Sequence, residues 1–144
     1  MRELQFVAKI NTTKEKVWDT LWQDITFRDW ASIIDPGTYM VGELKEGNEI
    51  QFISSENGYG VTSRVEKLIA NELLLLRHES DTQDIGKRGR EPEWSGGKES
   101  YTLTERKGVT LLTATFDVPP EQEKYFNDAY PKALERIKEL AENQ

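Results

Sequence analysis

The sequence predicts an α+β fold in which a curved antiparallel sheet wraps around a long C-terminal helix. Three observations support this prediction: a series of short alternating segments separated by turn residues, two short helical patterns after the first segment, and one long amphipathic pattern at the end of the chain. Strands that are segregated from a helix covering one face form an α+β domain. We expect residues 1–144 to form one domain, because that length matches a domain of ordinary size.

Near the N-terminus, a strand over residues 4–10 is predicted by apolar side chains that alternate with other residues. Thr12 and Glu15 have the spacing of a capping box, which predicts the start of a helix. Apolar pairs at helical spacing continue that helix, and we expect Asp24 to cap a second, shorter one. The Asp-Pro-Gly sequence at 35–37 predicts a turn after the helices.

The middle of the chain is predicted to form a series of hairpins. The Asn-Gly pair at 57–58 is among the strongest short-range hairpin signals, and short connections favour antiparallel neighbours. The run Leu73–His78 is apolar on both faces, and we assign it to a strand because of its hairpin context. The predicted strands after the helices cover residues 39–44, 49–53, 59–68, 73–78, 99–104 and 109–118.

The connection between residues 80 and 97 is long for a compact domain and has little to bury beyond Ile85 and Trp94. Connections of this length without regular structure are usually functional or disordered. We expect a mobile loop near the mouth of a cavity, with Trp94 as its anchor.

The last segment, residues 119–144, has apolar side chains at steps of three and four and charged side chains between them. This spacing predicts an amphipathic helix roughly 35 Å long, enough to cross a small domain. Pro131 interrupts the pattern, because proline in a helix removes one hydrogen bond and clashes with the preceding turn. We expect a kink or a restart of the helix there, with a hinge over the cavity as the alternative.

The composition excludes several classes of function. The chain has no cysteine, so disulfides and thiolate chemistry are excluded. Its net charge of −7 and pI near 4.9 argue against nucleic-acid binding, which requires a basic surface. No segment has the apolar length of a secretory signal or of a membrane span. We therefore expect a cytoplasmic protein that neither binds nucleic acid nor inserts into a membrane.

Several local patterns occur in an order that resembles START-like (SRPBCC) domains. Residues 6–18 resemble the opening strand, short link and "VW" helix of these domains, and Trp30 stands where they often have a tryptophan closing the second helix. Pro36-Gly37, Glu46-Gly47 and the strand 99–103 before the final helix continue the resemblance, which covers essentially the whole chain. The subgroup it resembles most is the one named for activators of the Hsp90 ATPase (AHSA1-like).

This resemblance implies a helix-grip (START/Bet v 1-like) fold, in which the sheet and the C-terminal helix enclose a pocket for hydrophobic molecules. The superfamily includes lipid carriers, hormone receptors, polyketide cyclases and co-chaperone domains, so the fold does not determine the function. We expect a binding protein for a small hydrophobic or amphipathic molecule, with no cofactor. The alternatives are a module that modulates an Hsp90-type chaperone in a stress response, and a cyclase- or dehydratase-like enzyme.

Aromatic residues are the main candidates for lining the pocket, although each one could equally belong to an ordinary core. Trp and Tyr have polar tips that need partners when buried, and ligand pockets combine apolar walls with a few polar groups. We assign Trp18, Trp22 and Phe27 to the packing of the early helices. The aromatic candidates for the pocket are Trp30, Tyr39, Phe52, Tyr59, Tyr101, Phe116, Phe126 and Tyr130.

Two polar residues complete the candidate ligand-binding set. His78 is the only histidine, and we favour a core or surface role for it over a role in the site. Glu99 shares the strand parity of Tyr101, which points it inward as a possible hydrogen-bond acceptor or base, but we favour a solvated position at the strand end. A Ser63-His78-Asp81 triad can be drawn, but such sets arise by chance, and we assign no catalytic residue. No ligand spacing indicates a metal site.

Overall fold

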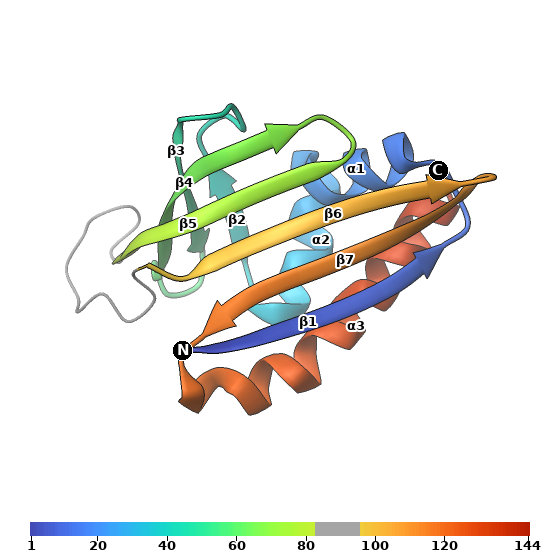
Figure 1. Ribbon diagram of the computed structural model, residues 1–144. Helices are drawn as coiled ribbons and strands as arrows, with labels where there is room; N and C mark the ends of the chain where they lie inside the picture. The colour runs from blue at the N-terminus through green and yellow to red at the C-terminus, as the bar shows by residue number, and fades with distance from the viewer. Residues whose placement is uncertain (83–95) are drawn as a thin grey trace.

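The computed structural model describes residues 1–82 and 96–144. In this part of the chain, seven antiparallel strands form one sheet in the order β1-β7-β6-β5-β4-β3-β2, and the α-helices lie on one side of it (Figure 1). The prediction of an α+β fold with a sheet around a long C-terminal helix is confirmed. The strands are β1 (Arg2–Ile10), β2 (Thr38–Val41), β3 (Glu49–Ser54), β4 (Gly60–Ile69), β5 (Leu73–Thr82), β6 (Lys98–Arg106) and β7 (Val109–Val118). The helices are α1 (Lys14–Trp22), α2 (Asp24–Ile34) and α3 (Glu123–Glu142), with a short 3-10 turn η1 (Pro120–Gln122) before α3.

Alternation along the strands gives the sheet one apolar face. In β7, Thr110, Leu112, Ala114 and Phe116 are buried, while Leu111, between the first two, is exposed. Since successive side chains of a strand point to opposite faces, one face of β7 packs against the helices and the other faces solvent. The buried residues of β1, β5 and β6 continue this apolar face into a common core with the helices.

A close approach between β3 and β4 fixes the far end of the sheet. Gly60 pairs with Ile53 in the register of the two strands. A Cβ atom built on Gly60 would lie 1.7 Å from the carbonyl oxygen of Phe52, which is far inside van der Waals contact. Only glycine therefore fits at this position without moving the backbone of β3.

The two short helices form where the sequence predicts them, but their first residues differ from the prediction. Thr13, rather than Thr12, is the N-cap of α1, and its side chain accepts a hydrogen bond from the Lys16 amide. The Thr12 carbonyl instead accepts a hydrogen bond from the Thr110 hydroxyl of β7. Asp24 is the first residue of α2 rather than its cap, and it pairs with Arg28 one turn later.

The long helix α3 continues through Pro131 and bends along its course (Figure 1). Its C-terminal half is joined to the rest of the fold by polar contacts. Arg136 makes a two-pronged ion pair with Asp29 of α2, with both nitrogen–oxygen distances 2.8 Å. The Glu142 carboxylate accepts a hydrogen bond from the Asn11 amide at the end of β1. These contacts fix the part of the helix that follows Pro131.

Two predicted boundaries need correction. The strand predicted over 39–44 is shorter, since β2 ends at Val41, where Gly42 adopts a positive φ of 105°. The connection predicted from residue 80 begins later, because β5 continues to Thr82. The expected loop and its anchor Trp94 otherwise lie outside the described residues. No helix among the described residues combines the length and hydrophobicity needed to cross a bilayer.

Candidate functional site

A cavity of about 400 Å³ lies between the concave face of the sheet, the C-terminal half of α2 and the N-terminal half of α3. Its volume is within the range of pockets for small organic molecules. Nine of the twenty described residues in its wall are aromatic, and seven others have polar or charged side chains. The described residues that line it are Phe27, Trp30, Ala31, Ile34, Asp35, Thr38, Phe52, Asn57, Tyr59, Gly60, Val61, His78, Glu99, Tyr101, Phe116, Asp117, Gln122, Tyr125, Phe126 and Tyr130.

The aromatic wall is formed by rings that pack against one another. Phe116 of β7 and Tyr130 of α3 have ring centroids 4.2 Å apart, and Phe126 lies 5.7 Å from Tyr130 on the same helix face. On the other side, Phe27 of α2 contacts Phe52 of β3, with centroids 5.6 Å apart. Contacts between rings at these distances stabilise a wall of defined shape.

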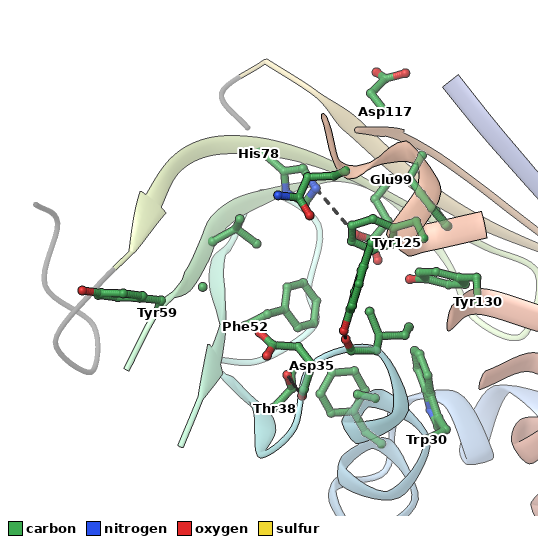
Figure 2. Close-up of a pocket in the computed structure, with 18 of the residues that line it drawn as sticks. Trp30, Asp35, Thr38, Phe52, Tyr59, His78, Glu99, Asp117, Tyr125 and Tyr130 are labelled. Atoms are coloured by element: carbon green, nitrogen blue, oxygen red, sulfur yellow. Dashed lines mark hydrogen bonds and ion pairs between the residues drawn. The ribbon is translucent and has the colours of Figure 1, made fainter. Parts of the chain in front are cut away.

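A buried polar network crosses the sheet at the inner end of the cavity. The Ser63 Oγ atom lies 2.6 Å from His78 Nδ1. His78 Nε2 lies 3.5 Å from a carboxylate oxygen of Glu99, and Figure 2 shows the two side chains facing each other. The other oxygen of Glu99 accepts a hydrogen bond from the Tyr101 hydroxyl, which is 3.1 Å from the Tyr130 hydroxyl. Since Tyr101 donates to Glu99, Tyr130 donates to Tyr101. One carboxylate therefore serves both a histidine and a pair of tyrosines.

A bulge between β4 and β5 brings the first two members of this network together. Thr62 pairs with Ser80, but the next residue, Ser63, pairs with His78, so Glu79 is the extra residue of β5. Because of this extra residue, both Ser63 and His78 are buried on the concave face. Sequence reasoning favoured a core or surface role for His78, whereas the structure places it in the cavity wall.

Glu99 reaches the cavity from β6, where it pairs with Phe116 of β7 and Leu76 of β5. The favoured expectation of a solvated strand end is wrong, because the Glu99 side chain is only 17% exposed. Glu99 points inward, as its shared parity with Tyr101 predicts. Because β6 lies between β5 and β7, the neighbouring strands shield this side chain from solvent. Burial raises the pKa of the Tyr101 and Tyr130 hydroxyls well above the ordinary value, and the adjacent Glu99 carboxylate raises both further.

The mouth of the cavity lies between the C-terminal end of α2 and the first turn of α3. The Tyr125 hydroxyl donates a hydrogen bond to the Ile34 carbonyl, which joins the two helices across this opening. Asp35 lies next to it, and desolvation followed by the charge of Glu56 raises the pKa of its carboxyl group. Burial and the charge of Asp35 in turn raise the pKa of Tyr125.

The structure brings nine of the ten predicted site residues into this wall and leaves Tyr39 outside it. Tyr39 lies on the short edge strand β2, where the Arg28 guanidinium stands 5.1 Å from the centre of its ring. Tyr59 is 43% exposed, and Figure 2 shows its ring directed away from the other labelled side chains. Tyr59 therefore belongs to the rim of the cavity.

Sequence reasoning missed several members of the site. Phe27 lines the cavity as well as packing the early helices, and Tyr125 and Asp35 form the mouth. The sequence does contain a signal that Tyr125 faces the core: it precedes Phe126 in the predicted helix and lies one turn before the apolar Ala129. Nothing in the sequence pairs Ile34 with Tyr125, since 91 residues separate them.

A second hollow, of about 420 Å³, lies between the outer edge of β1 and α3. Phe6 is its only aromatic residue among the described residues, and Lys9, Glu135 and Lys138 give it a charged rim. It therefore offers far fewer aromatic contacts to a ligand than the first cavity does. Within residues 1–82 and 96–144, no three His, Asp or Glu side chains are grouped as a metal site requires.

Comparison with solved structures places the fold in a known class. The chain resembles protein MLL2253 from Mesorhizobium loti with a TM-score of 0.74 and 17% sequence identity, over 99% of this chain and 98% of that one. It resembles the Aha1 dimer from Colwellia psychrerythraea with a TM-score of 0.74 and 21% identity, over 99% and 97% of the two chains. These likenesses fit a helix-grip, SRPBCC-like fold.

A third neighbour comes from a biosynthetic context. DynU16, from the dynemicin biosynthetic locus, has a TM-score of 0.69 and 12% identity, and the match covers 95% of this chain and 46% of that one. No family model matches the sequence, and no curated protein is similar to it. At these identities, the structural likeness concerns the fold alone.

Proposed function

We propose that this protein binds a small hydrophobic or amphipathic molecule in the cavity between the sheet and α3. The observation that carries the proposal is the cavity itself, which combines aromatic walls with a buried polar network. In such a site, the apolar part of a ligand is buried against the walls, and the polar groups of the protein orient the polar group of the ligand. Each Å² of apolar ligand surface that leaves water contributes about 25 cal/mol.

The experiment that tests this proposal is a thermal-shift screen against sterols, flavonoids, aromatic polyketides, alkyl and aryl amines, and fatty acids. A ligand at 100 times its dissociation constant adds about 2.7 kcal/mol of stability, which raises the melting temperature by several degrees. A flat screen with a well-folded protein would contradict the proposal.

A cavity-filling variant locates the binding. Ala31 of α2 is buried and lines the cavity, so Ala31→Leu places extra methyl groups in the space that a ligand would occupy. We expect this variant to fold and to lose the thermal shift. The matched control is Val7→Leu, which enlarges an exposed residue of β1 outside the cavity and keeps the shift.

A second candidate function is acid–base catalysis of a cyclase or dehydratase type, and the specific observation in its favour is the His78–Glu99–Tyr101–Tyr130 network. Glu99 and His78 face each other at 3.5 Å, which gives a proton acceptor and a proton donor within one site. The test is product formation from linear aromatic polyketides, followed by mass spectrometry. Turnover that Glu99→Gln abolishes would favour this candidate over simple binding.

A third candidate is modulation of an Hsp90-type chaperone, as the AHSA1-like resemblance implies. Its support is the structural likeness to the Aha1 of Colwellia psychrerythraea. The measurement is the ATP turnover of an Hsp90 with and without this protein, and an unchanged rate would remove the candidate. For all three functions we propose that the chain works as one cytoplasmic domain.

A further inference from the structure

The charged groups of the cavity wall are acidic. Among the described residues that line it, Asp35, Glu99 and Asp117 have carboxylates, and none is a lysine or an arginine. Asp117 is directed away from the other labelled side chains in Figure 2, and its carboxylate accepts a hydrogen bond from the Lys98 amide. The two carboxylates left to act on a ligand are Glu99 at the inner end and Asp35 at the mouth.

The partners of Glu99 differ from those of the carboxylates on the outer surface of the sheet. Glu66 pairs with Arg77 at 2.8 Å, and Glu79 pairs with Arg64 at 3.2 Å. Glu99 is far less exposed, yet among the described residues no lysine or arginine nitrogen lies within ion-pair distance of it. Its partners are the Tyr101 hydroxyl and the His78 ring. Among the described residues, the Glu99 carboxylate is therefore met by a tyrosine hydroxyl and a histidine ring rather than by a permanently charged lysine or arginine.

The cavity wall also offers apolar surface for the rest of a ligand. Phe116, Phe126 and Tyr130 pack against one another there, with Phe126 and Tyr130 stacked. An anionic ligand would place its charge next to Glu99 without a lysine or arginine of the described lining to compensate it. A cation would meet the Glu99 carboxylate, and its apolar part would meet the aromatic wall.

We propose that the cavity binds an organic amine, whose ammonium group lies against Glu99 and whose apolar body lies against the aromatic wall. This inference rests on the proposed binding function and specifies the charge of its ligand. It separates this cavity from one that binds fatty acids.

Isothermal titration of the protein at neutral pH with two matched ligand series tests the proposal. One series is 2-(1-naphthyl)ethylamine, 2-(1-naphthyl)ethanol and 1-naphthylacetate, and the other is octylamine, octanol and octanoate. Since charge-assisted hydrogen bonds are about twice as strong as neutral ones, we expect the amine of a series to bind about tenfold tighter than its alcohol. The carboxylate is expected to bind weakest. Added salt should weaken the amine more than the alcohol.

The variant Glu99→Gln assigns the preference to its residue. We expect the preference for the amine over the alcohol to disappear, because both ligands then meet an uncharged side chain, while circular dichroism and the melting temperature show that the variant is folded. The matched control is Glu3→Gln, which removes the same charge from an exposed position of β1 and leaves the preference intact.

The possible outcomes separate the two proposals. Alcohols or carboxylates that bind as tightly as the amines would overturn the inference and leave the binding function standing. Failure of all six ligands would overturn the inference alone if another class of molecule gives a thermal shift, and a flat thermal-shift screen beside it would contradict the binding function itself. Because the ligand series is measured on the unmodified protein, the inference remains testable even if Glu99→Gln does not fold.

Discussion

Tyr101 holds the Glu99 carboxylate in place at the inner end of the cavity. Its side chain is 1% exposed, and its hydroxyl group donates to Glu99 while it accepts from Tyr130. Trp22 packs edge-on against its ring, with centroids 4.9 Å apart, so the phenol has no freedom to turn. The direction of the Glu99 carboxylate is therefore determined by the core rather than by solvent.

Removing this hydroxyl tests its structural role. We expect Tyr101→Phe to lower the free energy of unfolding by about 1–3 kcal/mol, because a half-buried carboxylate loses its donor. Urea denaturation followed by tryptophan fluorescence measures the change. Tyr39→Phe is the control, since it removes a hydroxyl from a partly exposed tyrosine outside the cavity and should leave the stability unchanged.

The same tyrosines make the stability depend on alkaline pH. The folded-state pKa values of Tyr101 and Tyr130 lie well above the ordinary value of 10.0, so the folded protein favours their protonated forms. Their contribution is complete below the unfolded-state pKa and is lost as the pH rises above it towards the folded-state pKa. We expect unfolding free energies to decline above about pH 10. The decline should be smaller in Tyr101→Phe, and an equal decline in both proteins would contradict the assignment.

At the scale of the elements, the ion pair between Arg136 and Asp29 couples α2 to α3. The Arg136 guanidinium lowers the pKa of the Asp29 carboxyl group, first through hydrogen bonding and then through its charge. A lowered folded-state pKa means that the pair stabilises the protein above the unfolded-state pKa of Asp29 and less as the pH falls. We expect Arg136→Gln to lower the urea midpoint at pH 7 and to differ less from the parent protein near pH 3. A difference that persists at acid pH would show that the pair is not responsible.

The hydrogen bond between Tyr125 and Ile34 closes the mouth at the N-terminal half of α3. Tyr125→Phe keeps the ring but removes this bond. Since a hydrogen bond contributes about 1 kcal/mol, we expect ligand association and dissociation both to become about fivefold faster, with little change in affinity. Stopped-flow fluorescence with a ligand from the thermal-shift screen measures both rates. Tyr39→Phe serves again as the control, and unchanged rates in Tyr125→Phe would show that access lies elsewhere.

The sequence allows prediction of the elements because their signals are local. The apolar alternation of β1 and the 3.6-residue spacing of α3 depend on neighbours in the chain, and both elements form as expected. The caps were less predictable, since Thr12 and Thr13 are equally suitable and only the contact of Thr12 with Thr110 decides between them. Local rules also point Glu99 inward, but the burial of its strand depends on its pairing with β5 and β7 on both sides in the assembled sheet.

For the whole molecule, the aromatic wall was more predictable than the polar network. Large aromatic side chains that point to the inner face of a small α+β domain must share one interior, so most of the expected set lines one cavity. The pairing of Ser63 with His78 depends on a bulge, and no turn residue in the sequence indicates where that bulge lies. The contact between Tyr125 and Ile34 depends on the position of α3 over α2, which only the assembled core determines.

The position of Gly60 has a consequence for evolution. A side chain at this position would occupy the space of the Phe52 carbonyl. Every other amino acid is therefore excluded as long as β3 and β4 pair at this distance. The structural neighbours described above share only 12–21% of their residues with this chain, so overall identity hardly reveals common descent. We expect a glycine at the structurally equivalent position to be conserved even among relatives with so little overall identity. It would mark the lineages in which this end of the cavity has kept its shape, even where the lining has changed to suit a different ligand.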